Sequence, residues 1–163
     1  MQEPVHFPDD IFTPVLLRHA RYAYGNAMRS ALAEAGYDDI PKNGLYVIGG
    51  LALDLADVPL GQIIREMRLS KQAAGQLVDA LVLRGYLERD VDPADRRKLT
   101  VTLTQRGRAA AMTQRTAREK VDAELVARAG QEAVDCTRRT LAILIGIGEE
   151  MEKPRKDEPD DDE

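Results

Sequence analysis

The sequence predicts a mainly α-helical fold with one small β-hairpin, an α+β architecture, from two observations. Apolar residues recur at three- and four-residue steps over most of the chain, which is the period of amphipathic helices. One stretch near residue 100 instead alternates apolar and polar residues, which is the period of a strand. With 163 residues and 44% apolar composition, the chain can bury a core as one domain with extensions.

A long amphipathic helix is predicted over residues 11–36, because the helical pattern continues until Gly36. A second helical run, residues 41–53, contains three glycines, each costing up to about 1 kcal/mol relative to alanine. We expect this run to be buried, with its glycines permitting close approach of its neighbours. Residues 105–153 are predicted to be helical again, with a break near Gly130.

Between these regions, two short helical runs, residues 60–67 and 70–84, are separated by about two residues, which is the spacing of a helix-turn-helix. Gly85 then supplies a natural helix C-cap. A hairpin follows, with strands at residues 86–91 and 99–104 around a turn at residues 92–95. The order helix, turn, helix, hairpin is that of a winged helix-turn-helix, which we place at residues 40–104.

The flanking regions, residues 11–36 and 105–153, carry apolar stripes that a winged helix of about 65 residues cannot cover. These stripes must pack on each other or on a second copy of the chain. A two-fold dimer is the simplest solution, and it sets the spacing of two winged helices. We therefore predict a helical dimerisation region and a homodimer.

The composition excludes several classes of protein. No apolar run approaches the roughly 20 residues of a membrane span, and residues 1–14 lack the features of a secretion signal. We therefore expect a cytoplasmic protein without a membrane partner. The single cysteine, Cys136, excludes an internal disulfide, and His6 and His19 show no metal-ligand spacing with it. Neither a metal site nor a cofactor is expected.

The charge of the chain is unevenly placed, although its formal net charge is -5. Residues 154–163 hold two basic and six acidic residues, and we expect this polar, proline-containing segment to be a disordered acidic tail. Residues 60–110 hold ten basic and six acidic residues. The middle of the chain is therefore a basic module, which suits a nucleic-acid partner.

The second helix of the pair carries a candidate DNA-reading face. At 100° per residue, its apolar residues fall on one side and short polar residues on the other. Glutamine can bond an adenine edge, lysine can reach a phosphate or a guanine, and a serine at the helix start can cap it and contact phosphate. The alternative is an ordinary solvated helix face. The candidate residues are Ser70, Lys71, Gln72, Gly75 and Gln76.

The tip of the hairpin is a sharper signal, because it places Asp95, Arg96, Arg97 and Lys98 in succession. Ordinary hairpin stability does not require such a cluster. Arginine on a protruding wing suits the narrow, negative minor groove, and the other cations can neutralise phosphates and release counterions. Asp95 would be a local acceptor that steers the Arg97 side chain. The alternative is a charged turn that only keeps the hairpin soluble.

The stretch LSKQAAGQLVDALVLRGYLERDVDPADRRKLTVTLTQRGRAAA resembles the core of MarR-type transcriptional regulators. Its wing matches the Asp-x-Arg of that family at Asp95 and Arg97, followed by Leu103, Thr104 and the Gly107 that opens the next helix. The resemblance covers about residues 40–110, and the flanking helices agree in order and length with the dimerisation helices of the family.

The resemblance implies a homodimer of winged helices on double-stranded DNA with a palindromic operator. It places residues 70–76 in the major groove and Arg97 in the minor groove. It also implies control of transcription, most simply as a repressor that a small phenolic or anionic effector releases. Ligand pockets of the family lie between the dimerisation helices and the winged helix, so His19, Tyr22 and Tyr46 are the candidate effector-binding residues. A buried Tyr or His with a satisfied hydrogen bond is the alternative for each.

Two further expectations concern the remaining chemistry. Cys136, close in sequence to Val134 and Leu141 on the last helix, is expected to be a small buried hydrophobe. The sequence contains no nucleophile-base pattern and no phosphate-cradling glycine loop, so we do not expect an enzyme. The alternative function is a winged helix that binds an acidic protein partner without specific DNA binding.

Overall fold

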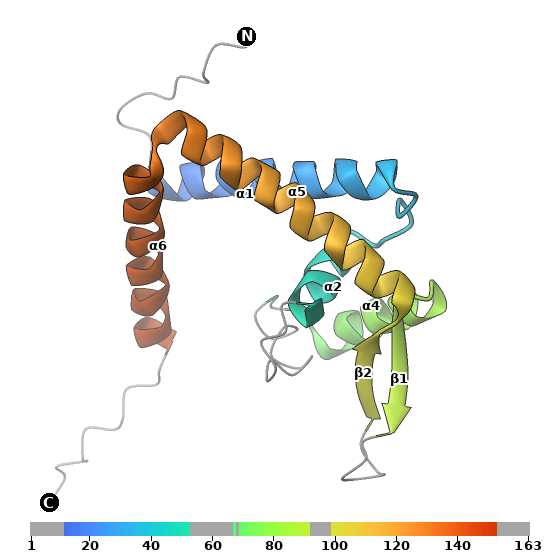
Figure 1. Ribbon diagram of the computed structural model, residues 1–163. Coiled ribbons are helices and arrows are strands. Elements are labelled where there is room, and N and C mark those ends of the chain that lie inside the picture. The colour runs from blue at the N-terminus through green and yellow to red at the C-terminus, as the bar shows by residue number, and fades with distance from the viewer. Residues whose placement is uncertain (1–11, 53–66, 68, 92–98, 153–163) are drawn as a thin grey trace, which may run out of the picture. The chain divides into compact units, whose positions relative to one another are not determined.

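The computed structural model describes residues 12–52, 67, 69–91 and 99–152, and these form helices and one antiparallel hairpin (Figure 1). The elements are α1 (Thr13–Glu34), α2 (Gly44–Ala52), α4 (Lys71–Leu83), β1 (Leu87–Val91), β2 (Leu99–Leu103), α5 (Gln105–Ala129) and α6 (Gln131–Glu152). This order confirms the predicted mainly α fold with a small hairpin. Most of the predicted helix at 60–67, the wing tip and the acidic tail lie outside the described residues.

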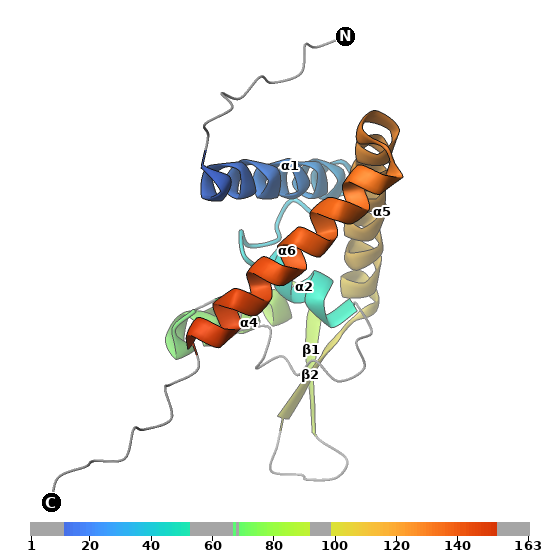
Figure 2. The same ribbon diagram turned by 90° about the vertical axis from the view of Figure 1, so that its left-hand side faces the viewer.

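The chain divides into two units, Met1–Val121 and Asp122–Glu163, and the first holds the hydrophobic core. In this unit α2 contacts β2 and α4, and α4 contacts β1. Both views show the hairpin pointing away from α1 (Figure 1, Figure 2). The largest fully buried side chains are Tyr86, Ile48, Leu81, Leu87 and Val47.

Helix α4 is anchored by one face, as its sequence period predicts. Its buried residues are Ala74, Leu77, Val78 and Leu81, which recur at three- and four-residue steps. The helix is followed by Gly85, whose φ of +71° is the left-handed conformation of a helix C-cap. The chain therefore turns directly from α4 into β1.

The hairpin pairs its strands in antiparallel register, from Leu87 opposite Leu103 to Val91 opposite Leu99. Leu87 and Leu103 are buried, whereas Glu88 and its partner on β2 are exposed. The alternation confirms that one face of the hairpin packs on the core.

Glycines allow two close approaches that set the position of the hairpin and of α2. A Cβ on Gly107 would lie 2.1 Å from the backbone oxygen of Tyr86, so α5 begins directly against the start of β1. A Cβ on Gly44 would lie 2.9 Å from the Leu81 side chain, which confirms the expected close packing around α2.

The second unit contains the end of α5 and the whole of α6. Gly130, with a φ of +83°, separates the two helices at the predicted break. Helix α6 exposes a set of large apolar side chains, with exposed fractions from 43% to 81%: Ile143, Leu144, Ile145, Ile147 and Met151.

The prediction of a buried Cys136 is wrong, because the residue is exposed on α6. Val134 is buried, but it lies two residues away. Two residues correspond to about 200° around a helix, so neighbours in the sequence lie on opposite faces.

Candidate functional site

The first two turns of α4 present a polar surface. Ser70 caps the helix, since its Oγ accepts a hydrogen bond of 3.2 Å from the backbone N–H of Ala73. The capped end is positively polarised and attracts anions such as phosphate. The structure brings the five predicted residues of this helix together, all of them exposed: Ser70, Lys71, Gln72, Gly75 and Gln76.

Gly75 leaves the middle of this surface open. Among the described residues, no side chain or neighbouring element lies within 4 Å of a Cβ built at Gly75. One turn further along, Asp79 forms an ion pair with Arg89 of β1. The pair is solvent-exposed and worth at most about 1 kcal/mol, but it links the polar face of α4 to the hairpin.

The wing residues Asp95, Arg96, Arg97 and Lys98 lie outside the described residues. The described register ends with Val91 opposite Leu99. The role of the four residues stays a prediction.

A polar cluster that was not predicted from the sequence joins the α1–α2 connection to the bases of β1 and α5. Arg106 donates hydrogen bonds of 2.9 Å to the carboxylate of Asp39 and to the hydroxyl of Tyr86. The Tyr86 hydroxyl in turn donates to Asp39. The guanidinium carbon of Arg106 lies 4.6 Å from the centroid of the Tyr86 ring. The cluster thus ties the end of α4, through Tyr86, to the segment that leads into α2.

The same contacts shift the pKa values of Asp39 and Tyr86, and they raise the pKa of Arg106. The hydrogen bond from Tyr86, assisted by Arg106, holds the pKa of Asp39 below its ordinary value of 3.8. Burial raises the pKa of Tyr86, and the bond to Asp39 adds to that effect. At neutral pH the carboxylate is therefore charged, the phenol is neutral, and both can keep their hydrogen bonds.

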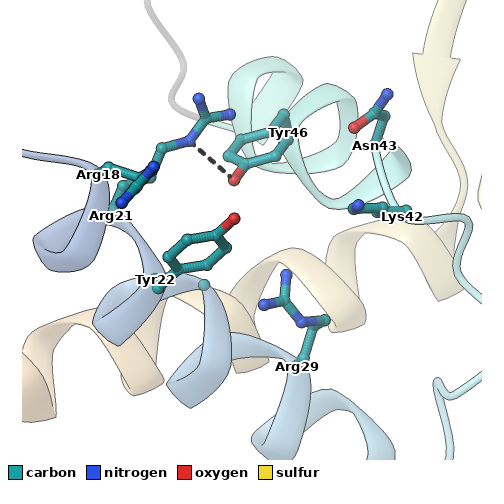
Figure 3. A pocket seen from close by; sticks show the side chains of 8 residues that line it. Arg18, Arg21, Tyr22, Arg29, Lys42, Asn43 and Tyr46 are labelled. Carbon is teal, nitrogen blue, oxygen red and sulfur yellow. Dashed lines mark hydrogen bonds between the residues drawn. The ribbon is translucent and has the colours of Figure 1, made fainter. Parts of the chain in front are cut away.

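A cavity of about 260 Å³, which we call the cationic cavity, opens between α1 and α2 (Figure 3). Two of the predicted effector residues, Tyr22 and Tyr46, line it. His19 is exposed on α1 and does not line it, because one residue along a helix turns the side chain by about 100°. Among the described residues, the lining includes four basic side chains and no acidic one: Arg18, Arg21, Arg29 and Lys42.

Hydrogen bonds hold two of these arginines in place. The Nε of Arg21 donates to the Tyr46 hydroxyl at 3.3 Å, and its guanidinium carbon lies 5.0 Å from the centroid of that ring. Arg29 donates to the side chain of Asn26 at 2.7 Å. In Figure 3 the guanidinium of Arg29 and the hydroxyl of Tyr22 point into the same opening.

The basic lining was missed at the level of the sequence, although a signal for it exists. Residues 18, 21, 22, 25 and 29 recur at three- and four-residue steps, so they share one face of α1. Lys42 joins them only through the folding of the α1–α2 connection.

The described part of the chain holds neither a metal-ligand cluster nor a helix suited to cross a membrane. No group of three or more His, Cys, Asp and Glu side chains there could hold a metal ion. None of the helices described has the length and apolar character that crossing a bilayer requires.

The described elements define a winged helix: a core-anchored helix with a polar exposed face, followed directly by a two-stranded hairpin. The sequence profile of the MarR family matches residues 46–98. The resemblance to the MarR family is therefore confirmed over these residues. No curated protein matches the sequence.

Three solved structures have a similar fold at low sequence identity. The S. aureus MepR–DNA complex has a TM-score of 0.66 and 16% identity, over 84% of this chain and 98% of that chain. S. aureus MepR bound to ethidium bromide has a TM-score of 0.56 and 16% identity, over 85% and 98%. Apo wild-type MarR from E. coli has a TM-score of 0.61 and 19% identity, over 83% and 98%.

Proposed function

We propose that the protein is a homodimeric, sequence-specific DNA-binding regulator of transcription that acts in the cytoplasm. It represses its genes from a palindromic operator and is released by a small phenolic or anionic ligand. The observation that carries the proposal is the exposed polar start of α4 opposite a buried, anchoring face. The solved MepR–DNA complex supports the use of this fold on DNA.

In this proposal the start of α4 enters the major groove. Gln72 and Gln76 bond base edges, and Lys71 with Ser70 contacts phosphates. The wing residues contact the minor groove and the flanking backbone: Asp95, Arg96, Arg97 and Lys98. Half-sites then lie about one helical turn apart, roughly 10 base pairs.

Selection of bound duplexes from a random pool, followed by titrations at several salt concentrations, tests DNA binding. We expect a palindrome and an affinity that falls steeply with salt. Lys71→Ala should flatten the salt dependence, whereas Lys120→Ala, which removes the same charge from α5, should not. Gln76→Ala should relax base preference more than it lowers nonspecific affinity. A pool without enrichment and an affinity insensitive to salt would contradict the proposal.

The exposed apolar surface of α6 supports the dimer. Ile143 is 66% exposed, and Ile147, one turn further along the same face of α6, is 48% exposed, in a single copy of the chain. Large apolar patches of this kind in soluble proteins mark interfaces. Covering the surface with a second copy gives an isologous, two-fold contact and two reading helices on one DNA molecule.

Sedimentation of two matched variants tests the dimer. Ile147→Glu places a charge on the apolar surface of α6, and we expect a monomer with weaker operator binding. Ala142→Glu adds the same charge at an exposed position about 140° away around the helix and should stay dimeric. A wild-type protein that sediments as a monomer at micromolar concentration would refute this part.

The cationic cavity is the candidate effector site. Its four basic side chains attract an anion, and Tyr22 and Tyr46 add polar aromatic contacts. MepR has been solved with ethidium bromide, whose organic ion is a cation. A cation would be repelled by this cavity, so the effector of this chain is anionic.

A further inference from the structure

A second cavity, of about 240 Å³, adjoins the cationic cavity and differs in character. It lies at the end of α1, under the α1–α2 connection. Arg29 and Lys42 line both cavities and therefore form the wall that they share. Most of the remaining lining is apolar, and we call this space the apolar cavity: Leu32, Ala33, Ile40, Pro41 and Leu45.

The shared wall is polarised. The guanidinium nitrogens of Arg29 fold back over Gly25, where a Cβ would lie 3.4 Å from them. Gly25 lines only the cationic cavity, so the charged head of Arg29 faces that side. Long basic side chains cover apolar surface with their aliphatic stems. The wall thus offers charge to one cavity and hydrocarbon to the other.

The charges around the two cavities favour a carboxylate in the cationic cavity. No acidic side chain of the described residues lines the cationic cavity, whereas Asp38 lines the apolar cavity. Repulsion by Asp38 disfavours an acid group there, and the basic side chains favour it on the other side. An apolar chain has the opposite preference, because burial against Leu32 and Leu45 removes it from water.

We propose that the two cavities are halves of one site for an amphipathic monocarboxylic acid with an unbranched apolar chain. The carboxylate lies among Arg18, Arg21 and Lys42, and the chain passes the shared wall into the apolar cavity. Lys42 is exposed and lies in the α1–α2 connection, so its aliphatic stem can move aside without unfolding either helix. The inference rests on the proposed effector site and gives its ligand a chemical class, but it is independent of DNA binding.

Calorimetric titration of the full-length protein with butanoate, octanoate, decanoate and decanol tests the site. Once the chain reaches the apolar cavity, each added methylene should tighten binding by up to about fourfold. Decanol, which lacks the charge, should bind at least about tenfold more weakly than decanoate. Equal affinities for butanoate and decanoate would overturn the proposal.

Two variants separate the halves of the site. Ala33→Phe, at an exposed position of α1, fills the apolar cavity and should abolish the dependence on chain length without changing butanoate binding. Ala23→Phe adds the same volume to the same helix outside both linings and is its control. Arg18→Met should weaken all the acids and spare decanol, whereas Arg139→Met on α6 should weaken none. An equal loss of affinity for butanoate and for decanoate in Ala33→Phe would overturn the two-part site.

Operator binding by the same proteins keeps the two proposals distinguishable. If decanoate binds with the expected chain-length dependence and the protein ignores DNA, the regulator is refuted and the site stands. If the operator is bound and no acid binds, the site is refuted and the DNA-binding function stands.

Discussion

Tyr86→Phe tests the polar cluster that joins the hairpin to the α1–α2 connection. The substitution keeps the buried ring and removes only the hydroxyl, which bonds the Asp39 carboxylate and accepts from Arg106 at 2.9 Å. A hydrogen bond to a charged group contributes about 1.5–3 kcal/mol. Asp39 is 41% exposed and keeps Arg106 as a partner, so water and Arg106 compensate part of the loss. We expect the free energy of unfolding to fall by about 1–2 kcal/mol.

Urea denaturation of the single variants and of the double variant with Asp39→Asn measures the effect. In the double-mutant cycle, the Tyr86 and Asp39 substitutions should couple by at least about 0.5 kcal/mol, because they remove the same bond. Matched m-values would show that the unfolded state is unchanged. Additivity within about 0.3 kcal/mol, or an unchanged stability of Tyr86→Phe, would refute the assigned role of the hydroxyl.

Three further predictions concern stability. In urea denaturation, Gly107→Ala should lower the free energy of unfolding by about 2–4 kcal/mol, because its Cβ would collide with a backbone oxygen. Gly75→Ala, in open space, should raise the free energy of unfolding by up to about 1 kcal/mol. Equal effects of the two substitutions would contradict the packing at Gly107. Ser70→Ala removes the helix cap and should lower the free energy of unfolding by about 1 kcal/mol. An unchanged free energy of unfolding would exclude the capping hydrogen bond. Folding lowers the pKa of Asp39, so the stabilising contribution of its carboxylate is present above pH 3.8 and is lost as the pH falls below that value. The difference in unfolding free energy between wild type and Asp39→Asn should therefore narrow below pH 3.8. A difference that stays constant with pH would contradict the lowered pKa.

Local chemistry determined much of this protein before any contact was known. The period of three and four residues placed Ala74, Leu77, Val78 and Leu81 on the buried side of α4, and the structure confirms all four. Gly85 and Gly130 marked helix ends because only glycine readily adopts a positive φ there. The polar start of α4 followed from the same period, since a residue facing away from the core must face solvent.

Only the tertiary structure decided which distant residues meet. Tyr86 and Asp39 are 47 positions apart, and no local period relates them. The two cavities depend on the path of the α1–α2 connection, which brings Lys42 to the same wall as Arg29. Cys136 was misplaced for a related reason, since apolar neighbours in the sequence do not share a helix face with it. Periodicity reports which side of an element is buried, whereas partners across the fold are set by the packing of elements against each other.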